Sequence, residues 1–130
     1  MFRIQSPLAV AAATLVLAAC QPMAIHNVAD APVSTSSGKA ASATQVRSAI
    51  ITAGTALGWS IKDDGPGRLE GTLRLRDHAA VVEIPYSGSR YSITYKSSEN
   101  LQAGDGKIHK NYNGWVQNLD RAIRAEISRI

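Results

Sequence analysis

The chain has 130 residues and a formal net charge of +4, and 45% of its residues are apolar. This composition excludes a collagen-like, coiled-coil or multi-pass membrane protein, and the single cysteine excludes a disulfide scaffold. The apolar residues are unevenly placed, with 14 in the first 19 positions and 44 in the following 111. An apolar block after a basic start is typical of a processing signal rather than a core. We therefore expect an exported chain with one small mixed domain.

The first twenty residues end in a four-residue motif. Arg3 gives a basic start, and residues 4–16 are mostly Ala, Leu and Val, fewer than the roughly 20 apolar residues that span a bilayer. Leu17-Ala18-Ala19-Cys20 follows, with two small residues before a thiol that can carry a lipid as a thioether. This motif resembles the lipobox of bacterial lipoproteins. The alternative is a plain secretory signal that happens to end near a cysteine.

The lipobox resemblance implies that residues 1–19 are a signal peptide, that cleavage precedes Cys20, and that Cys20 carries a diacylglyceryl thioether, usually with a third acyl chain. Cys20 is the only cysteine, so it cannot form an intramolecular disulfide in an oxidising compartment. Gln21 replaces the Asp that retains lipoproteins in the inner membrane under the enteric-type rule. We expect a protein of the cell envelope, lipid-anchored in the outer membrane and facing the periplasm.

Residues 20–43 are predicted to be the lipidated cysteine and a flexible tether. Residues 21–43 contain Pro22, Pro32 and a Ser/Thr/Gly run, and they show no sustained helical or strand period. Residues 44–130 are predicted to be the single domain.

The domain begins with a helical pattern. Val46, Ile50, Ala53 and Leu57 fall on one helical stripe, Ser42 or Thr44 can cap its start, and Gly58 suits its end. Gly54 is a weak helix former and would allow close approach to a sheet.

Four runs with period-2 alternation follow, joined by short turns, which predicts an antiparallel meander. Their inward sets are Trp59 and Ile61; Leu69, Gly71, Leu73 and Leu75; Ala80, Val82, Ile84 and Tyr86; and Tyr91, Ile93 and Tyr95. A polar loop over residues 97–111 precedes a second helix, whose stripe is Tyr112, Trp115, Val116, Leu119, Ile123, Ile127 and Ile130. The predicted fold is α+β, in the order helix, four-stranded antiparallel meander, helix, with both helices packed on one face of the sheet.

Asn111 or Asn113 is expected to cap the second helix, and His109 to cap or brace it. Tyr112-Asn113-Gly114-Trp115, together with Gly58-Trp59, resembles a family of small uncharacterised proteobacterial lipoproteins that have a Tyr-Asn-x-Trp element before the last helix. That resemblance implies no known activity. Trp115 lies on the apolar stripe, which favours a core position over a ligand-stacking role.

No assembled catalytic site is evident. The chain has no Gly-x-Ser-x-Gly elbow and no phosphate loop, and His26, His78 and His109 lack the spacing of metal ligands on one helix. We expect no enzyme activity, no metal and no cofactor. The expected role is a non-enzymatic binding or assembly module that is monomeric and has an unknown partner. The alternatives are a small envelope enzyme or inhibitor whose site the sequence does not reveal, and a structural spacer.

The remaining candidate is the outward sheet face. It is predicted to carry Lys62, Arg68, Arg74, Arg76, Arg90 and Lys96 against Asp64, Glu70 and Glu83. One interpretation is an ordinary solvated face. The other is a face for an anionic partner, either an envelope component or an acidic protein, since the compartment and the lack of stacking aromatics disfavour nucleic acid. The sheet edge and residues 97–111 are the other candidate surfaces.

Overall fold

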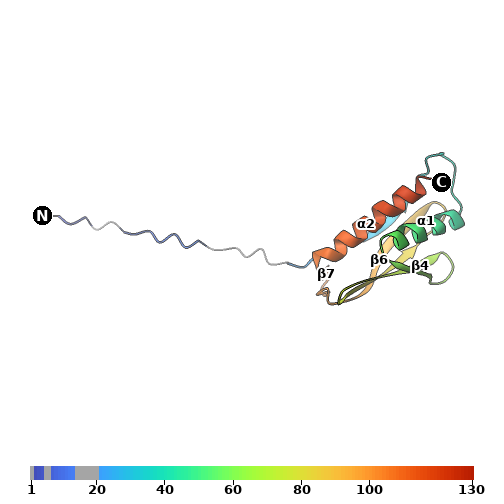
Figure 1. Cartoon of the computed structure of the whole chain (residues 1–130). Helices are drawn as coiled ribbons and strands as arrows, with labels where there is room; N and C mark the ends of the chain where they lie inside the picture. Colours follow the sequence, from blue (N-terminus) through green and yellow to red (C-terminus); the bar gives the residue numbers. More distant parts are fainter. Residues whose placement is uncertain (1, 5–6, 14–20) are drawn as a thin grey trace.

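A computed structural model describes residues 2–4, 7–13 and 21–130 (Figure 1). The described residues before position 14 are exposed and form no helix or strand. The motif at residues 17–20, including Cys20, lies outside the described residues. Neither helix in the described part of the chain has the length and hydrophobicity needed to cross a membrane.

The main sheet has five antiparallel strands in the order β2-β6-β5-β4-β3. They are β2 (Val28–Pro32), β3 (Ser60–Asp63), β4 (Arg68–Leu75), β5 (His78–Pro85) and β6 (Arg90–Glu99). The last four pair in sequence order, as the alternating runs predicted, because short turns allow only antiparallel neighbours.

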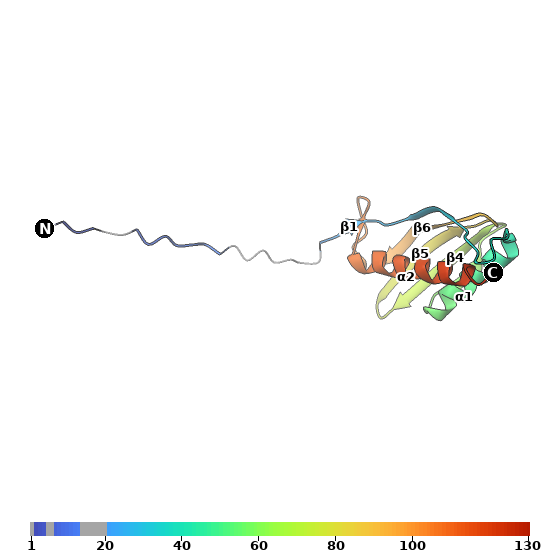
Figure 2. The same cartoon turned by 90° about the horizontal axis from the view of Figure 1, so that it is seen from above.

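The two helices, α1 (Ala43–Ala56) and α2 (Lys110–Ile127), lie on one face of this sheet (Figures 1 and 2). Ser42 caps α1 through a capping box with Gln45, and Gly58 follows its end at φ +89°, as predicted. The α+β class is therefore confirmed, with two helices and a mostly antiparallel sheet.

The strand count was wrong, and so was the prediction of a flexible tether through residue 43. β2 pairs with β6, and its Val28 and Ala31 belong to the core. The strand was missed because it is only five residues long, ends in Pro32, and is interrupted at Asp30, whose φ is +48°. Such an irregularity breaks the period-2 pattern that marks a strand.

A second, two-stranded sheet fixes the start of the folded unit. β1 (Met23–Ala24) pairs with β7 (Lys107–Ile108), within the segment predicted to be a polar loop. The N–H of Ile25 donates to Gly106 O at 2.9 Å. The first strand thus begins three positions after Cys20 in the sequence.

The core lies between the helices and the sheet. Two glycines make room for it: a Cβ on Gly54 would lie 2.8 Å from Ile61 Cδ1, and one on Gly71 would lie 3.1 Å from the same atom. The expected role of Gly54 in close helix–sheet approach is confirmed. Trp59 is buried, whereas Trp115 is only half-buried at the margin of the core.

Leu75 does not join the core, contrary to the prediction. It alternates correctly with Leu69 and Leu73, but its residue is 50% exposed, whereas Leu73 is 9% exposed. Gly58, just past the end of α1, lies beside Leu73, so the strand continues beyond the cover that this helix provides.

Candidate functional site

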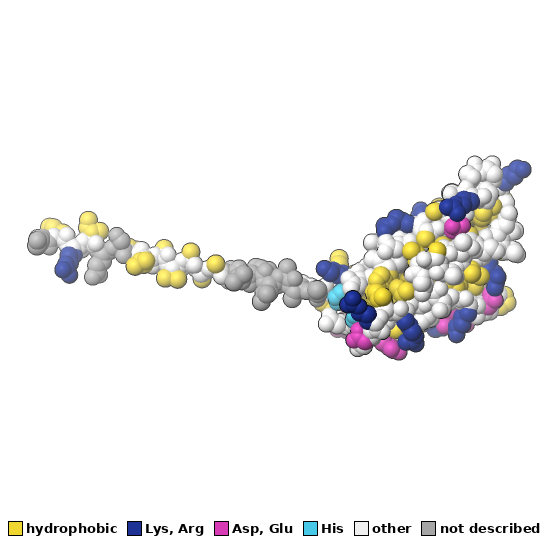
Figure 3. All heavy atoms as spheres, viewed as in Figure 1, with side chains coloured by type: hydrophobic (Ala, Val, Ile, Leu, Met, Phe, Trp, Pro, Cys, Tyr) yellow, Lys and Arg dark blue, Asp and Glu magenta, His cyan; other side chains and the backbone are white. Residues whose placement is uncertain are grey.

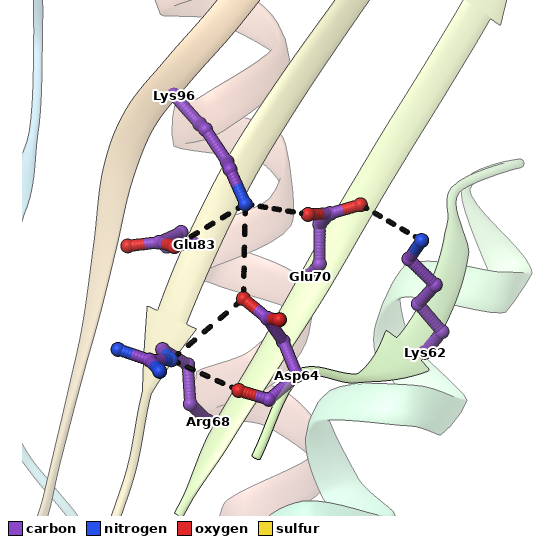
Figure 4. Close-up of polar contacts among 6 residues, drawn as sticks. All are labelled: Lys62, Asp64, Arg68, Glu70, Glu83 and Lys96. Atoms are coloured by element: carbon purple, nitrogen blue, oxygen red, sulfur yellow. Dashed lines mark hydrogen bonds and ion pairs between the residues drawn. The ribbon is translucent and has the colours of Figure 1, made fainter.

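The outward sheet face carries a network of ion pairs centred on Lys96 (Figure 4). Its Nζ lies 2.8 Å from Glu70 Oε2, 3.4 Å from Glu83 Oε1 and 3.7 Å from Asp64 Oδ2. Lys62 Nζ lies 3.3 Å from Glu70 Oε1. Each carboxylate in the group therefore faces at least one cation.

The central position of Lys96 depends on an irregularity in the sheet. Ser97 pairs with Val81 and Tyr95 pairs with Val82, so Lys96 is the extra residue of a bulge between β5 and β6. A bulge re-aims the side chain that it carries. The alternation in the sequence predicted that Lys96 points outward, but it did not predict the contacts with these three carboxylates.

The ion pairs also shift the protonation of their members. Hydrogen bonds from Lys96 and then Lys62 lower the pKa of the Glu70 carboxyl, against a smaller opposing effect of desolvation. The hydrogen bond to Glu70 raises the pKa of Lys96. Both groups are therefore held in their charged forms.

The six predicted cations do not form one basic patch. Lys62, Arg68 and Lys96 are opposed by three carboxylates, since Arg68 Nε lies 3.7 Å from Asp64 Oδ2 and donates to Asp64 O at 3.0 Å. This part of the face is balanced in formal charge, which reduces its attraction for a distant anion.

The other three cations lie at the two ends of the sheet. Arg74 Nη1 is 3.9 Å from Glu99 Oε2, in a loose exposed pair. Arg76 lies in the β4–β5 turn at φ +57°, and Arg90 Nη1 donates to Asp30 O at 3.0 Å. The structure therefore separates Arg90 from Arg74 and Arg76.

A partly buried carboxylate, Asp120, links α2 to β6. The Tyr91 hydroxyl donates to Asp120 Oδ1 at 2.5 Å, and Arg124 Nε donates to Asp120 Oδ2 at 3.0 Å. Burial, followed by the bond to Asp120, raises the pKa of the Tyr91 hydroxyl. Because both carboxylate oxygens are already bonded and Tyr91 stays protonated, this group acts as a structural contact between layers.

A groove of about 310 Å³ separates the start of α1 from the end of α2. Its lining is mainly small and hydroxylic on α1, with Glu126 on α2 and Arg129 just beyond the end of that helix. Glu126 and Arg129 pair with each other at 3.3 Å. The groove therefore offers hydroxyl groups and few free charges to a ligand.

The three histidines have separate positions. His109 caps α2 by accepting from the N–H of Asn111 at 3.2 Å, as expected, and Asn111 and Asn113 do not cap it. His78 Nδ1 lies 2.8 Å from Asn100 O. Within residues 2–4, 7–13 and 21–130, no group of three His, Cys, Asp or Glu side chains could hold a metal ion.

Asn113 has a role that the sequence did not suggest. The N–H of His26 donates to Asn113 Oδ1 at 2.9 Å, and Asn113 Nδ2 donates to Ala24 O at 2.9 Å. One side-chain amide on α2 thus holds the backbone on both sides of Ile25. The only available signal was the position of Asn113 beside Tyr112 and Trp115.

Comparison with known proteins finds no matching family model, no matching curated protein and no matching solved structure. The Tyr-Asn-Gly-Trp element nevertheless has a clear structural basis in this chain. Tyr112 is fully buried and meets Tyr95 edge to face, with ring centroids 5.5 Å apart. Asn113 binds the first strand segment, and Trp115 covers the margin of the core.

Proposed function

We propose that this chain is a lipoprotein of a bacterial cell envelope, anchored through acylated Cys20, with a domain that is a non-enzymatic binding or assembly module. The observation that carries the proposal is the position of Leu17-Ala18-Ala19-Cys20, which follows an apolar block and ends three positions before the first strand begins at Met23. A modifying enzyme needs such a cysteine outside the folded core. Gln21 favours the outer membrane in a host that follows the enteric-type rule.

A binding role is favoured by the state of the polar groups on the domain. The carboxylates of the sheet face are engaged by cations, and Asp120 is engaged by Tyr91 and Arg124. A general base needs a free lone pair directed at its substrate. An anionic envelope component is the partner class that we propose, because residues 20–130, without Arg3, still carry 13 Lys and Arg against 10 Asp and Glu, a net charge of +3.

The anchor is tested by replacing the cysteine. Cys20→Ser should abolish incorporation of labelled palmitate and should leave residues 1–19 attached, as read by mass spectrometry of the intact protein. Gln21→Asp is the matched control, because it should keep the acyl chains while moving the protein to the inner membrane of an enteric host. An acylated mature product from Cys20→Ser would contradict the proposal.

The anionic partner is tested separately, by titrating the acyl-free chain with lipopolysaccharide and with an anionic glycan at low and high salt. Arg74→Gln with Arg76→Gln should weaken binding at low salt, while stability changes by less than about 0.5 kcal/mol because both side chains are exposed. Lys39→Gln with Arg129→Gln removes the same charge elsewhere and is the control. Equal binding by both double variants would exclude the Arg74–Arg76 end of the face.

A further inference from the structure

The connection between the anchor and the domain is short. Cys20 and Met23 are three positions apart, so fully extended chain between their Cα atoms spans at most about 11 Å. β1 is not free to extend this link, because it pairs with β7 and is bonded by Asn113. A lipid attached at Cys20 therefore keeps the β1–β7 end of the domain beside the membrane.

Three large apolar side chains are exposed in the folded unit: Met23 at 53%, Leu75 at 50% and Leu57 at 42%. Leu57 directly follows α1, whereas the other two lie at the end that carries β1 and the β4–β5 turn. Met23 is in β1, and Leu75 is the last residue of β4, beyond the end of α1. The opposite end, which holds the start of α1 and the C-terminus in Figure 2, exposes no large apolar side chain among the described residues.

The two apolar strand positions belong to one surface. The turn after Leu75 is bonded to the end of β6 through Asn100, whose Nδ2 donates to Asp77 O at 2.7 Å. The next residue, Leu101, accepts from the N–H of His109 at 2.8 Å, directly beside β7. A continuous set of contacts thus runs from the β4–β5 turn to β7, which pairs with β1.

Cations surround these apolar positions. Lys107 and Lys110 flank the start of α2, and neither forms an ion pair with a described residue; Arg76 occupies the β4–β5 turn. The acidic residues at this end are Asp77, Glu99 and Asp105, of which Glu99 is paired with Arg74. Figure 3 shows basic and histidine side chains where the N-terminal segment joins the domain.

We propose that this end, consisting of Met23, Leu75, Arg76, Lys107 and Lys110, rests on the anionic lipid surface of the membrane that holds the anchor. The inference depends on the proposed acylation of Cys20, and it names anionic phospholipid as the component that the domain contacts. Exposed apolar side chains enter the interface between headgroups and acyl chains, while lysines beside them attract lipid phosphates within a Debye length. The groove between α1 and α2 then lies at the end away from the membrane.

The test uses the acylated mature protein in vesicles of phosphatidylethanolamine and phosphatidylglycerol. Since Cys20 is the only cysteine and is acylated, one introduced cysteine accepts one environment-sensitive fluorophore. Ala103→Cys places the label in the loop before β7, and Ala40→Cys places it in the loop before α1; both positions are exposed. We expect blue-shifted emission and quenching by nitroxide-labelled lipid at position 103 only.

The basic residues are tested in the Ala103→Cys background. Lys107→Gln with Lys110→Gln should reduce the blue shift and the quenching on anionic vesicles, whereas Lys39→Gln with Arg129→Gln should leave both unchanged. Mass spectrometry of each sample first establishes the acylation of Cys20. An unacylated protein would refute the anchor itself, whereas an acylated protein with equal signals at positions 103 and 40 would refute only the membrane contact.

Discussion

Asn113→Ala should release the N-terminal strand without unfolding the domain. The substitution removes the bond that Asn113 accepts from the N–H of His26 and the bond that it donates to Ala24 O, each 2.9 Å long. Hydrogen bonds contribute about 0.5–1.5 kcal/mol each, and because these two are exposed to solvent we take the lower part of that range, so the opening of β1 should become easier by roughly 1–2 kcal/mol. Ala is also a better helix former than Asn by up to about 0.7 kcal/mol, which offsets part of the loss in global stability.

The assay is hydrogen exchange followed by NMR on residues 21–130, which contain every described helix and strand. The reporter is the N–H of Ile25, which keeps its own partner, Gly106 O, in the variant. A change of 1–2 kcal/mol corresponds to exchange faster by a factor of about 5–30. The amides of Leu119 and Ile123, in the core of α2, should accelerate less than that of Ile25, because the higher helix propensity of Ala offsets part of the loss in global stability.

Two further variants make the result specific. Asn111→Ala is the matched control, because its side chain bonds to no described residue and it lies on the same turn of α2. Asn113→Asp keeps an acceptor for His26 but loses the donor to Ala24 and should give an intermediate rate. Unchanged exchange of Ile25 in Asn113→Ala, or equal acceleration in Asn111→Ala, would refute the assignment of Asn113 as the residue that holds β1.

Three other predictions concern stability measured by urea unfolding. Glu70→Gln should be less stable than the parent protein at pH 7. The difference in stability should vanish as the pH falls below 4.5 and through the lowered pKa of Glu70, because a depressed folded-state pKa stabilises the fold only while the carboxyl is ionised. A difference that does not depend on pH would contradict this. Tyr112→Phe should be as stable as the parent or more so, since the Tyr112 hydroxyl is buried without a partner among the described residues. Tyr91→Phe should lower the free energy of unfolding by about 1–3 kcal/mol, because it removes the hydrogen bond to the Asp120 carboxylate. Equal effects of the two substitutions would be inconsistent with these contacts. A chain of residues 44–130 should be less stable than residues 21–130, by about 1.5–3 kcal/mol for the lost burial of Val28 alone, and equal stability would show that β2 is dispensable.

The sequence by itself determined the elements that have a long local period. The stripe of α2 was predicted correctly at Tyr112, Val116, Leu119, Ile123 and Ile127, all of which are buried. The four later strands were predicted because alternation reports which face of a strand is covered and short turns leave antiparallel pairing as the only choice. The helix caps at Ser42 and His109 were also predicted from the sequence, because each side chain bonds to a backbone group only two or three residues away.

Only the tertiary structure decided the contacts between residues that are distant in the chain. β2 becomes a strand because β6 supplies its hydrogen bonds from residues 58 to 65 positions later, and five residues with an irregularity cannot signal this locally. Lys96 faces three carboxylates because a bulge turns it toward them, and Leu75 is exposed because α1 ends before covering it. A one-dimensional pattern assigns a side chain to a face, but its partners and its cover depend on where neighbouring elements begin and end in space.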